Sequence, residues 1–183
     1  VLLIEEPEAH LHPQIQSKLI KYLQKMANMD MLTEAMNRNA YENMIKYLDE
    51  QEIELRTTGV VLLDVDNLKE INDNFGHEKG DEALKLCYQC IRRAFKNEKN
   101  CFRIGGDEFL VLIPGITENL FQSMIRSILA NMAEGSVHLA LGSVWVEDCT
   151  DNAEKALSEA DARMYEDKWA YYAKNRQLDR RRR

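Results

Sequence analysis

Residues 60–66 read Val-Val-Leu-Leu-Asp-Val-Asp, and residues 103–109 read Arg-Ile-Gly-Gly-Asp-Glu-Phe. The four apolar residues 60–63 form a continuous run, which is typical of a strand that is buried on both faces. The Gly-Gly pair separates two short apolar segments, 101–104 and 109–113. It predicts a hairpin turn, because the tightest turns need positive φ.

Acidic residues follow the apolar run and the Gly-Gly pair. Carboxylates at these positions would be unfavourable at the end of a buried strand. Asp64 closes the apolar run, and a carboxylate there is costly unless it is paired or holds a metal. The predicted turn holds Asp107 and Glu108 at its exit. If these strands are neighbours, three carboxylates converge, and such hard oxygen ligands favour Mg²⁺ or Mn²⁺ with phosphate completing the shell. The alternative is a charged hairpin beside an exposed aspartate.

Helical and extended segments alternate along the rest of the chain. Apolar stripes predict helices over residues 39–52, 81–95, 120–132 and 153–169, and a strand over 137–146. This alternation indicates an α+β or α/β fold with a mixed sheet. A further helix over 14–29 carries a narrow apolar seam, which suits a partner helix, although packing on its own domain is the alternative. The polar tail from Lys174 to Arg183 predicts a frayed terminus.

Composition excludes several classes of protein. The 183 residues are 45% hydrophobic, which is enough for one domain with its own core. The net charge of −7 argues against broad nucleic-acid binding but allows a single nucleotide. The sequence has no apolar run near the roughly 20 residues of a membrane-spanning helix. Its four cysteines predict cytosolic thiols, and Cys87-x-x-Cys90 lacks the second pair of a zinc site, which favours a packed thiol.

The segment from residue 64 to residue 81 adds polar groups that suit a nucleotide. Lys69 offers a point charge for phosphate, and Asn72 and Asp81 could together read a purine edge. The residues follow the pattern Asp-x-Asp-x-x-Lys-x-x-Asn-x-x-x-Gly-His-x-x-Gly-Asp, and Arg-x-Gly-Gly-Asp-Glu-Phe comes after it. Together the two motifs resemble those of the GGDEF-type diguanylate cyclases. The resemblance covers residues 27–175, from the Asp-Met-Leu-Thr at 30–33 to the Met-Tyr-x-x-Lys at 164–168.

The resemblance implies an α+β fold similar to the palm of polymerases and adenylyl cyclases, with a mostly antiparallel sheet ringed by helices. It also implies a reaction in which a homodimer condenses two GTP into cyclic di-GMP and releases two pyrophosphates. The cofactor would be Mg²⁺ or Mn²⁺, held by Asp64, the carbonyl of Val65, Asp107 and Glu108, with Asp107 the expected base. The alternative is a catalytically silent GTP-binding module that signals by protein contact. The residues expected to bind substrate are Lys69, Asn72, Phe75, His77, Asp81, Arg103, Gly105, Gly106 and Lys168.

Three positions depart from the family pattern. The usual product-inhibition motif, Arg-x-x-Asp, is replaced here by Lys96-Asn97-Glu98-Lys99, so we expect little feedback through that site. The glycine that usually follows Leu-Thr is Glu34, and the arginine often found four residues after Lys168 is Tyr172.

The first thirteen residues differ from the rest of the chain. Residues 1–13 resemble the Walker B strand of ABC-type and related ATPases, but the sequence lacks the phosphate-binding loop Gly-x-x-x-x-Gly-Lys-Ser/Thr. We therefore divide the chain into a non-functional ATPase-like fragment (1–13), a leading helix (14–29), a cytoplasmic cyclase domain (30–175) and a basic tail (176–183). A sensor or larger partner segment would set the dimerisation of such a domain.

Overall fold

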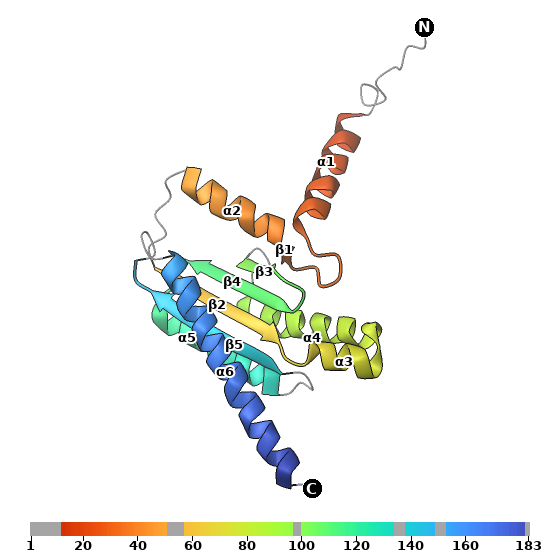
Figure 1. Cartoon of the computed structure of the whole chain (residues 1–183). Coiled ribbons are helices and arrows are strands. Elements are labelled where there is room, and N and C mark those ends of the chain that lie inside the picture. The colour runs from red at the N-terminus through yellow and green to blue at the C-terminus, as the bar shows by residue number, and fades with distance from the viewer. Residues whose placement is uncertain (1–11, 51–56, 97–99, 134–137, 149–152, 182–183) are drawn as a thin grey trace.

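The computed structural model describes residues 12–50, 57–96, 100–133, 138–148 and 153–181, and Figure 1 shows their arrangement. The elements follow one another as α1 (Pro13–Asn28), β1 (Met36–Asn37), α2 (Arg38–Glu50), β2 (Thr58–Val65), α3 (Leu68–Phe75), α4 (His77–Phe95), β3 (Cys101–Arg103), β4 (Glu108–Pro114), α5 (Glu118–Ala133), β5 (Leu139–Val146) and α6 (Ala153–Arg181).

The five strands form one sheet in the order β1-β3-β4-β2-β5. The short β1 pairs with β3 in parallel, whereas β3–β4, β4–β2 and β2–β5 are antiparallel. Strand β2 has neighbours on both sides, and all eight of its residues are buried, as its continuous apolar run predicts. The predicted α+β fold with a mostly antiparallel sheet is confirmed.

Helices cover both faces of the sheet, because successive side chains of a strand point to opposite faces. Leu63 and Phe109 belong to a core shared with α4 and α5. Leu62 and Leu110 belong to a second core, shared with α2 and α6. Gly142 of β5 lets α6 come unusually close, because a Cβ at this position would lie 1.8 Å from the carbonyl oxygen of Ala160. Figure 1 shows α6 crossing the sheet and continuing beyond its edge.

Several boundaries differ from those that the sequence predicts. Helix α4 begins four residues earlier than expected, and α3 was not expected as a helix. Helix α6 continues past the predicted end at Trp169 to Arg181, so the tail that we expected to be frayed has a helical backbone as far as Arg181. The ATPase-like residues 1–11 and residues 97–99 of the altered inhibition motif lie outside the described part of the chain.

The Gly-Gly hairpin forms, but the predicted reason for its glycines is wrong. Among the described glycines, positive φ occurs at Gly76 and Gly115 and not at Gly105 or Gly106. Gly105 instead leaves room for a neighbouring side chain, because a Cβ at this position would lie 2.6 Å from Oε2 of Glu108. The glycine therefore makes room for a carboxylate, and the turn needs no left-handed backbone.

Helix α1 projects away from the sheet and its helices (Figure 1). It contains no buried residue, although apolar residues recur along it at intervals of four and three. Asn37 anchors its end, because the side-chain amide donates to the carbonyl oxygens of Ala27 and Met29 at 3.0 and 3.3 Å. Over the described residues, every helix is too short or too polar to cross a membrane.

Candidate active site

Two acidic residues lie directly opposite each other where β2 and β4 meet the Gly-Gly hairpin. Asp64 of β2 is the register partner of Glu108 of β4, so both side chains project from the same face of the sheet. The backbone N–H of Val65 donates to the carbonyl oxygen of Asp107 at 3.0 Å, which places Asp107 beside them. The N–H of Ile104 donates to the carbonyl oxygen of Glu108 at 3.0 Å and closes the hairpin. The fold therefore brings the three predicted carboxylates to one end of the sheet.

The carboxylates destabilise one another's ionised forms. Burial raises the pKa of Glu108, and the nearby charges of Asp107, Asp64 and Asp161 raise it further. Burial also raises the pKa of Asp64; the hydrogen bond from Lys168 acts in the opposite direction, and the net shift is upward. Like charges that gather in a partly desolvated place favour a bound cation.

Lys168 of α6 supplies such a cation within the chain. Its Nζ lies 2.6 Å from Oδ1 of Asp64, and the two side chains are 29% and 10% exposed. Burial alone would lower the pKa of Lys168, but the bond to Asp64 outweighs it and raises that pKa. The sequence assigned Lys168 to the triphosphate; in this structure its immediate partner is a carboxylate.

The carboxylates at this end of the sheet are candidate ligands for a divalent metal. Within the described ranges, His, Cys, Asp and Glu side chains form no cluster of three that could hold a metal ion as it stands. The donor set itself fits, because Asp64, Asp107 and Glu108 are hard oxygen ligands of the kind that Mg²⁺ and Mn²⁺ prefer. Lys168 contacts only Oδ1 of Asp64 in this structure, and a metal bound to that carboxylate would compete with this cation.

The residues expected to read the base lie on α3 and α4. Gly80 allows Asn72 to reach the start of α4, because a Cβ at Gly80 would lie 2.0 Å from Oδ1 of Asn72. This contact places Asn72 next to the residue that precedes Asp81. Asp81, Phe75 and His77 are exposed, and Phe75 is 72% exposed despite its large apolar ring. Lys69 is exposed in the first turn of α3.

Arg103 is held by bonds inside the domain. Its Nη1 lies 2.9 Å from Oδ1 of Asp30, and its Nη2 donates to the carbonyl oxygen of Gly106 at 2.6 Å. The same Oδ1 of Asp30 accepts from the backbone and hydroxyl of Thr33. These bonds join the segment that follows α1 to the hairpin. The predicted contact of Arg103 with substrate stays a prediction.

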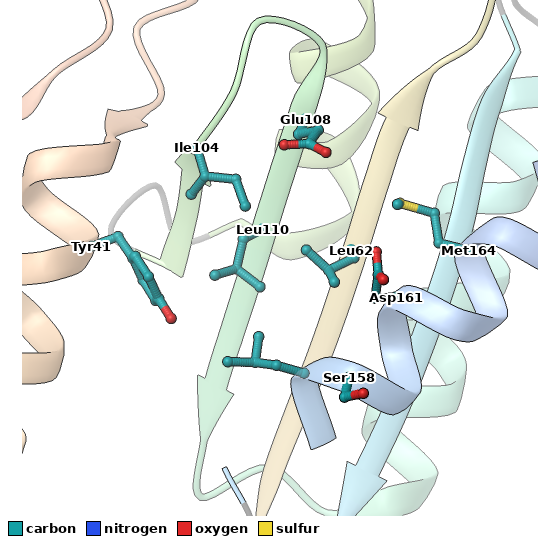
Figure 2. A pocket seen from close by; sticks show the side chains of 9 residues that line it. Tyr41, Leu62, Ile104, Glu108, Leu110, Ser158, Asp161 and Met164 are labelled. Atoms are coloured by element: carbon teal, nitrogen blue, oxygen red, sulfur yellow. The ribbon is translucent and has the colours of Figure 1, made fainter. Parts of the chain in front are cut away.

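A cavity of about 460 Å³ opens beside the carboxylates, on the face that α2 and α6 cover. Figure 2 shows Leu62 and Leu110 on the strands, with Glu108 at one end and Asp161 on the neighbouring helix. Glu108 therefore belongs both to this cavity and to the carboxylate group. The remaining lining residues are Tyr41, Ile104, Leu157, Ser158 and Met164.

The sequence did not reveal a second polar contact at this end of the sheet. Asp66 is buried, and its Oδ2 lies 2.6 Å from Nδ1 of His138. The backbone N–H of Asp66 also donates to the carbonyl oxygen of His138 at 3.1 Å. The two residues are 72 positions apart in the sequence, so no local pattern links them. The only available signal was the second aspartate of Asp64-Val65-Asp66.

Comparison with known proteins places this geometry in a family. The family described as "Diguanylate cyclase, GGDEF domain" matches residues 27–172, so the chain belongs to the GGDEF family. The match begins after the ATPase-like residues 1–13, and nothing in the comparisons supports that second resemblance.

Individual relatives carry different names. The chain is 29% identical to the diguanylate cyclase DgcS of Shewanella oneidensis over 86% of this chain and 55% of that protein. It is 31% identical to the cyclic di-GMP phosphodiesterase PdeB of the same organism over 80% of this chain and 18% of that protein. It thus spans about half or less of these relatives.

A solved structure shares the fold. The coiled coil and GGDEF domain of DgcB from Caulobacter crescentus, solved in complex with c-di-GMP, superposes with a TM-score of 0.70 at 19% identity. The alignment covers 86% of this chain and 88% of that one.

Proposed function

We propose that this chain is a diguanylate cyclase that condenses two GTP into cyclic di-GMP. The observation that carries the proposal is the pairing of Asp64 with Glu108 across β2 and β4, with Asp107 beside them. In each half-reaction the 3′-oxygen of one GTP attacks the α-phosphorus of the other. A P–O bond forms, the bond to the β-phosphate bridge breaks, and pyrophosphate leaves.

The residues of the chain would position the two reacting groups, which is the main work in phosphoryl chemistry. Asn72 and Asp81 bind the guanine edge, and the cations of Lys69 and Lys168 hold the triphosphate. Asp107 accepts the proton of the attacking 3′-hydroxyl. Because a site that hydrogen-bonds one base edge leaves buried groups unpaired with the wrong base, GTP is preferred over ATP.

A divalent metal would be held by Asp64, Glu108, Asp107 and the carbonyl of Val65. When bound, Mg²⁺ or Mn²⁺ supplies positive charge that offsets the triphosphate and favours the alkoxide form of the attacking hydroxyl. Burial and the neighbouring carboxylates raise the pKa values of Asp64 and Glu108, and the added positive charge of a metal would favour their ionised forms.

Dimerisation follows from stoichiometry, since each domain holds one GTP and the product contains two nucleotides joined twice. The exposed face of α1 supports a helical pairing: its apolar residues recur at intervals of four and three, the seam of a coiled coil. About two heptads are marginal alone, so we expect a monomer–dimer equilibrium. The seam residues on α1 are Ile15, Leu19, Tyr22 and Met26, which are 52%, 45%, 59% and 41% exposed. Met29, which we expected in the seam, follows the end of α1 in extended conformation and bridges to Met36.

One variant tests the catalytic assignment. Asp107→Asn keeps the size of the side chain and removes its charge, so the variant should fold and bind GTP but form no cyclic di-GMP. Glu118→Gln, at the start of α5, is the matched control and should retain activity. Product formation is measured by chromatography after incubation with GTP and Mg²⁺. Full activity of Asp107→Asn would refute the role of that carboxylate.

A silent GTP-binding module is the second candidate, and the bond between Lys168 and Asp64 favours it. A cation that already neutralises Asp64 lowers the affinity of that carboxylate for a metal. The two candidates differ in turnover: tight GTP binding by the wild-type dimer without any dinucleotide would support the module.

A further inference from the structure

The turn between β2 and α3 contacts His138, the residue that precedes β5, and through His138 it is linked to α6. Asp66 lies in this turn, two residues after Asp64 and three before Lys69. It contacts His138 twice, by a backbone hydrogen bond of 3.1 Å and by the side-chain contact of 2.6 Å. With the carboxylate ionised, Nδ1 of His138 is the donor.

His138 in turn rests on α6. Its ring stacks on Tyr171 with 3.7 Å between centroids and an interplanar angle of 11°. Tyr171 follows Lys168 by one helical turn, so both lie on the same side of α6. Helix α6 therefore contacts the end of β2 directly, through Lys168 and Asp64. It contacts the following turn indirectly, because Tyr171 stacks on His138, which in turn contacts Asp66.

The carboxylate of Asp66 has few polar partners, and His138 gives the short one. Its side chain has no exposed surface, and its Oδ1 makes no hydrogen bond within the described part of the chain. Tyr172 of α6 is a second polar neighbour of Asp66: burial raises the pKa of its phenol, and the charge of Asp66 and a hydrogen bond with its side chain raise that pKa further. A buried carboxylate is costly unless it is paired, so loss of the His138 donor would force the turn to rearrange. The rearrangement would move Asn67, which has a left-handed φ of 59°, and with it the start of α3 where Lys69 lies.

We propose that His138 is a positioning residue: by holding Asp66 against the start of β5 and against α6, it fixes the β2–α3 turn in the shape from which Lys69, at the start of α3, contacts the triphosphate. This inference rests on the proposed function, because it assumes that GTP is the ligand. It assigns a role in triphosphate affinity to a histidine that itself touches no substrate. Binding of the guanine, which depends on Asn72 and Asp81, should be independent of it.

The test separates the two properties of the histidine side chain. His138→Phe keeps a flat ring for Tyr171 and removes the donor, whereas His138→Asn keeps a donor near the position of Nδ1 and removes the ring. Tyr171→Phe is the matched control, because it retains the stacked ring and loses only a hydroxyl. Calorimetry in the presence of Mg²⁺ measures the affinity of each variant for two probes. The first is GTP with a methylene bridge between its α- and β-phosphates, and the second is GMP, which lacks the β- and γ-phosphates.

We expect His138→Phe to weaken binding of the triphosphate analogue about tenfold, because the rearranged turn loses the contact of Lys69 with phosphate, and to leave GMP binding within about twofold. His138→Asn should recover most of the affinity, and Tyr171→Phe should match wild type. His138→Leu replaces the Phe variant if thermal melting shows that the latter does not fold. Equal weakening of both probes, or unchanged triphosphate binding, would overturn the positioning role. Failure of the wild-type protein to bind the analogue would instead refute the proposed function.

Discussion

The contacts of Arg103 predict how firmly the hairpin is attached to the segment that follows α1. Its guanidinium bonds to Asp30 at 2.9 Å and to the carbonyl oxygen of Gly106 at 2.6 Å, and the Arg103 and Asp30 side chains are 13% and 23% exposed. A hydrogen bond to a charged group contributes about 1.5–3 kcal/mol, and partial exposure favours the lower end. Arg103→Ala should therefore lower the free energy of unfolding by about 3 kcal/mol. Arg103→Lys, which can reach one acceptor at a time, should lose about half as much.

Urea unfolding followed by circular dichroism measures these differences. For a domain of this size they correspond to roughly 6–12 °C in Tm for Arg103→Ala.

The stabilisation by the bond between Arg103 and Asp30 also depends on pH, with a defined sign. Burial raises the pKa of Asp30, but the bonds from Thr33 and Arg103 outweigh it and hold that pKa below its ordinary value of 3.8. The stabilisation is thus present above pH 3.8 and lost as the pH falls through the lower folded value, so the gap between wild type and Arg103→Ala should narrow in acid. Equal stability of Arg103→Lys and the wild-type protein, or a gap that is unchanged at low pH, would refute the reasoning.

Three further predictions concern the packing of the domain. Glu34 has a left-handed φ of 65°, which costs an L-residue about 1–2 kcal/mol, so Glu34→Gly should raise Tm by a few degrees; a lower Tm would contradict this. Gly142→Ala places a Cβ 1.8 Å from the carbonyl oxygen of Ala160, so it should destabilise the domain by about 1–3 kcal/mol in urea titration, and an unchanged midpoint would count against the close packing of α6 on β5. Burial raises the pKa of the Cys87 and Cys101 thiols to about 12, so iodoacetamide at pH 8 should label neither residue until urea unfolds the protein, as mass spectrometry of peptides can show.

The sequence predicted the centre of the fold well, because burial and pairing leave a local pattern there. The apolar run Val60–Leu63 is stable only where both faces of a strand are buried, and β2 is such a strand. The strands around Gly105 and Gly106 follow from their apolar flanks, although the glycines serve space and not positive φ. Helix α3 was missed because its eight residues include three Asn or Asp, which favour turns over helix interiors.

The site was only partly predictable, since its contacts join residues that are far apart along the chain. The carboxylates Asp64, Asp107 and Glu108 could be found from their positions at strand ends. The contact between Asp66 and His138 could not, because it depends on the register between β2 and β5. The pairing of Lys168 with Asp64 depends in the same way on how closely α6 approaches the sheet, which Gly142 decides.

Turnover per subunit over a wide dilution series tests the central claim most directly. The wild-type chain and Leu19→Lys are incubated with GTP and Mg²⁺ or Mn²⁺, cyclic di-GMP is quantified, and the oligomeric state is measured at each concentration. We predict that cyclic di-GMP forms, that activity per subunit falls as the dimer dissociates, and that Leu19→Lys requires a higher concentration to reach the same activity. Absence of cyclic di-GMP at every concentration, or activity per subunit that stays constant in a protein shown to be monomeric, would contradict the account.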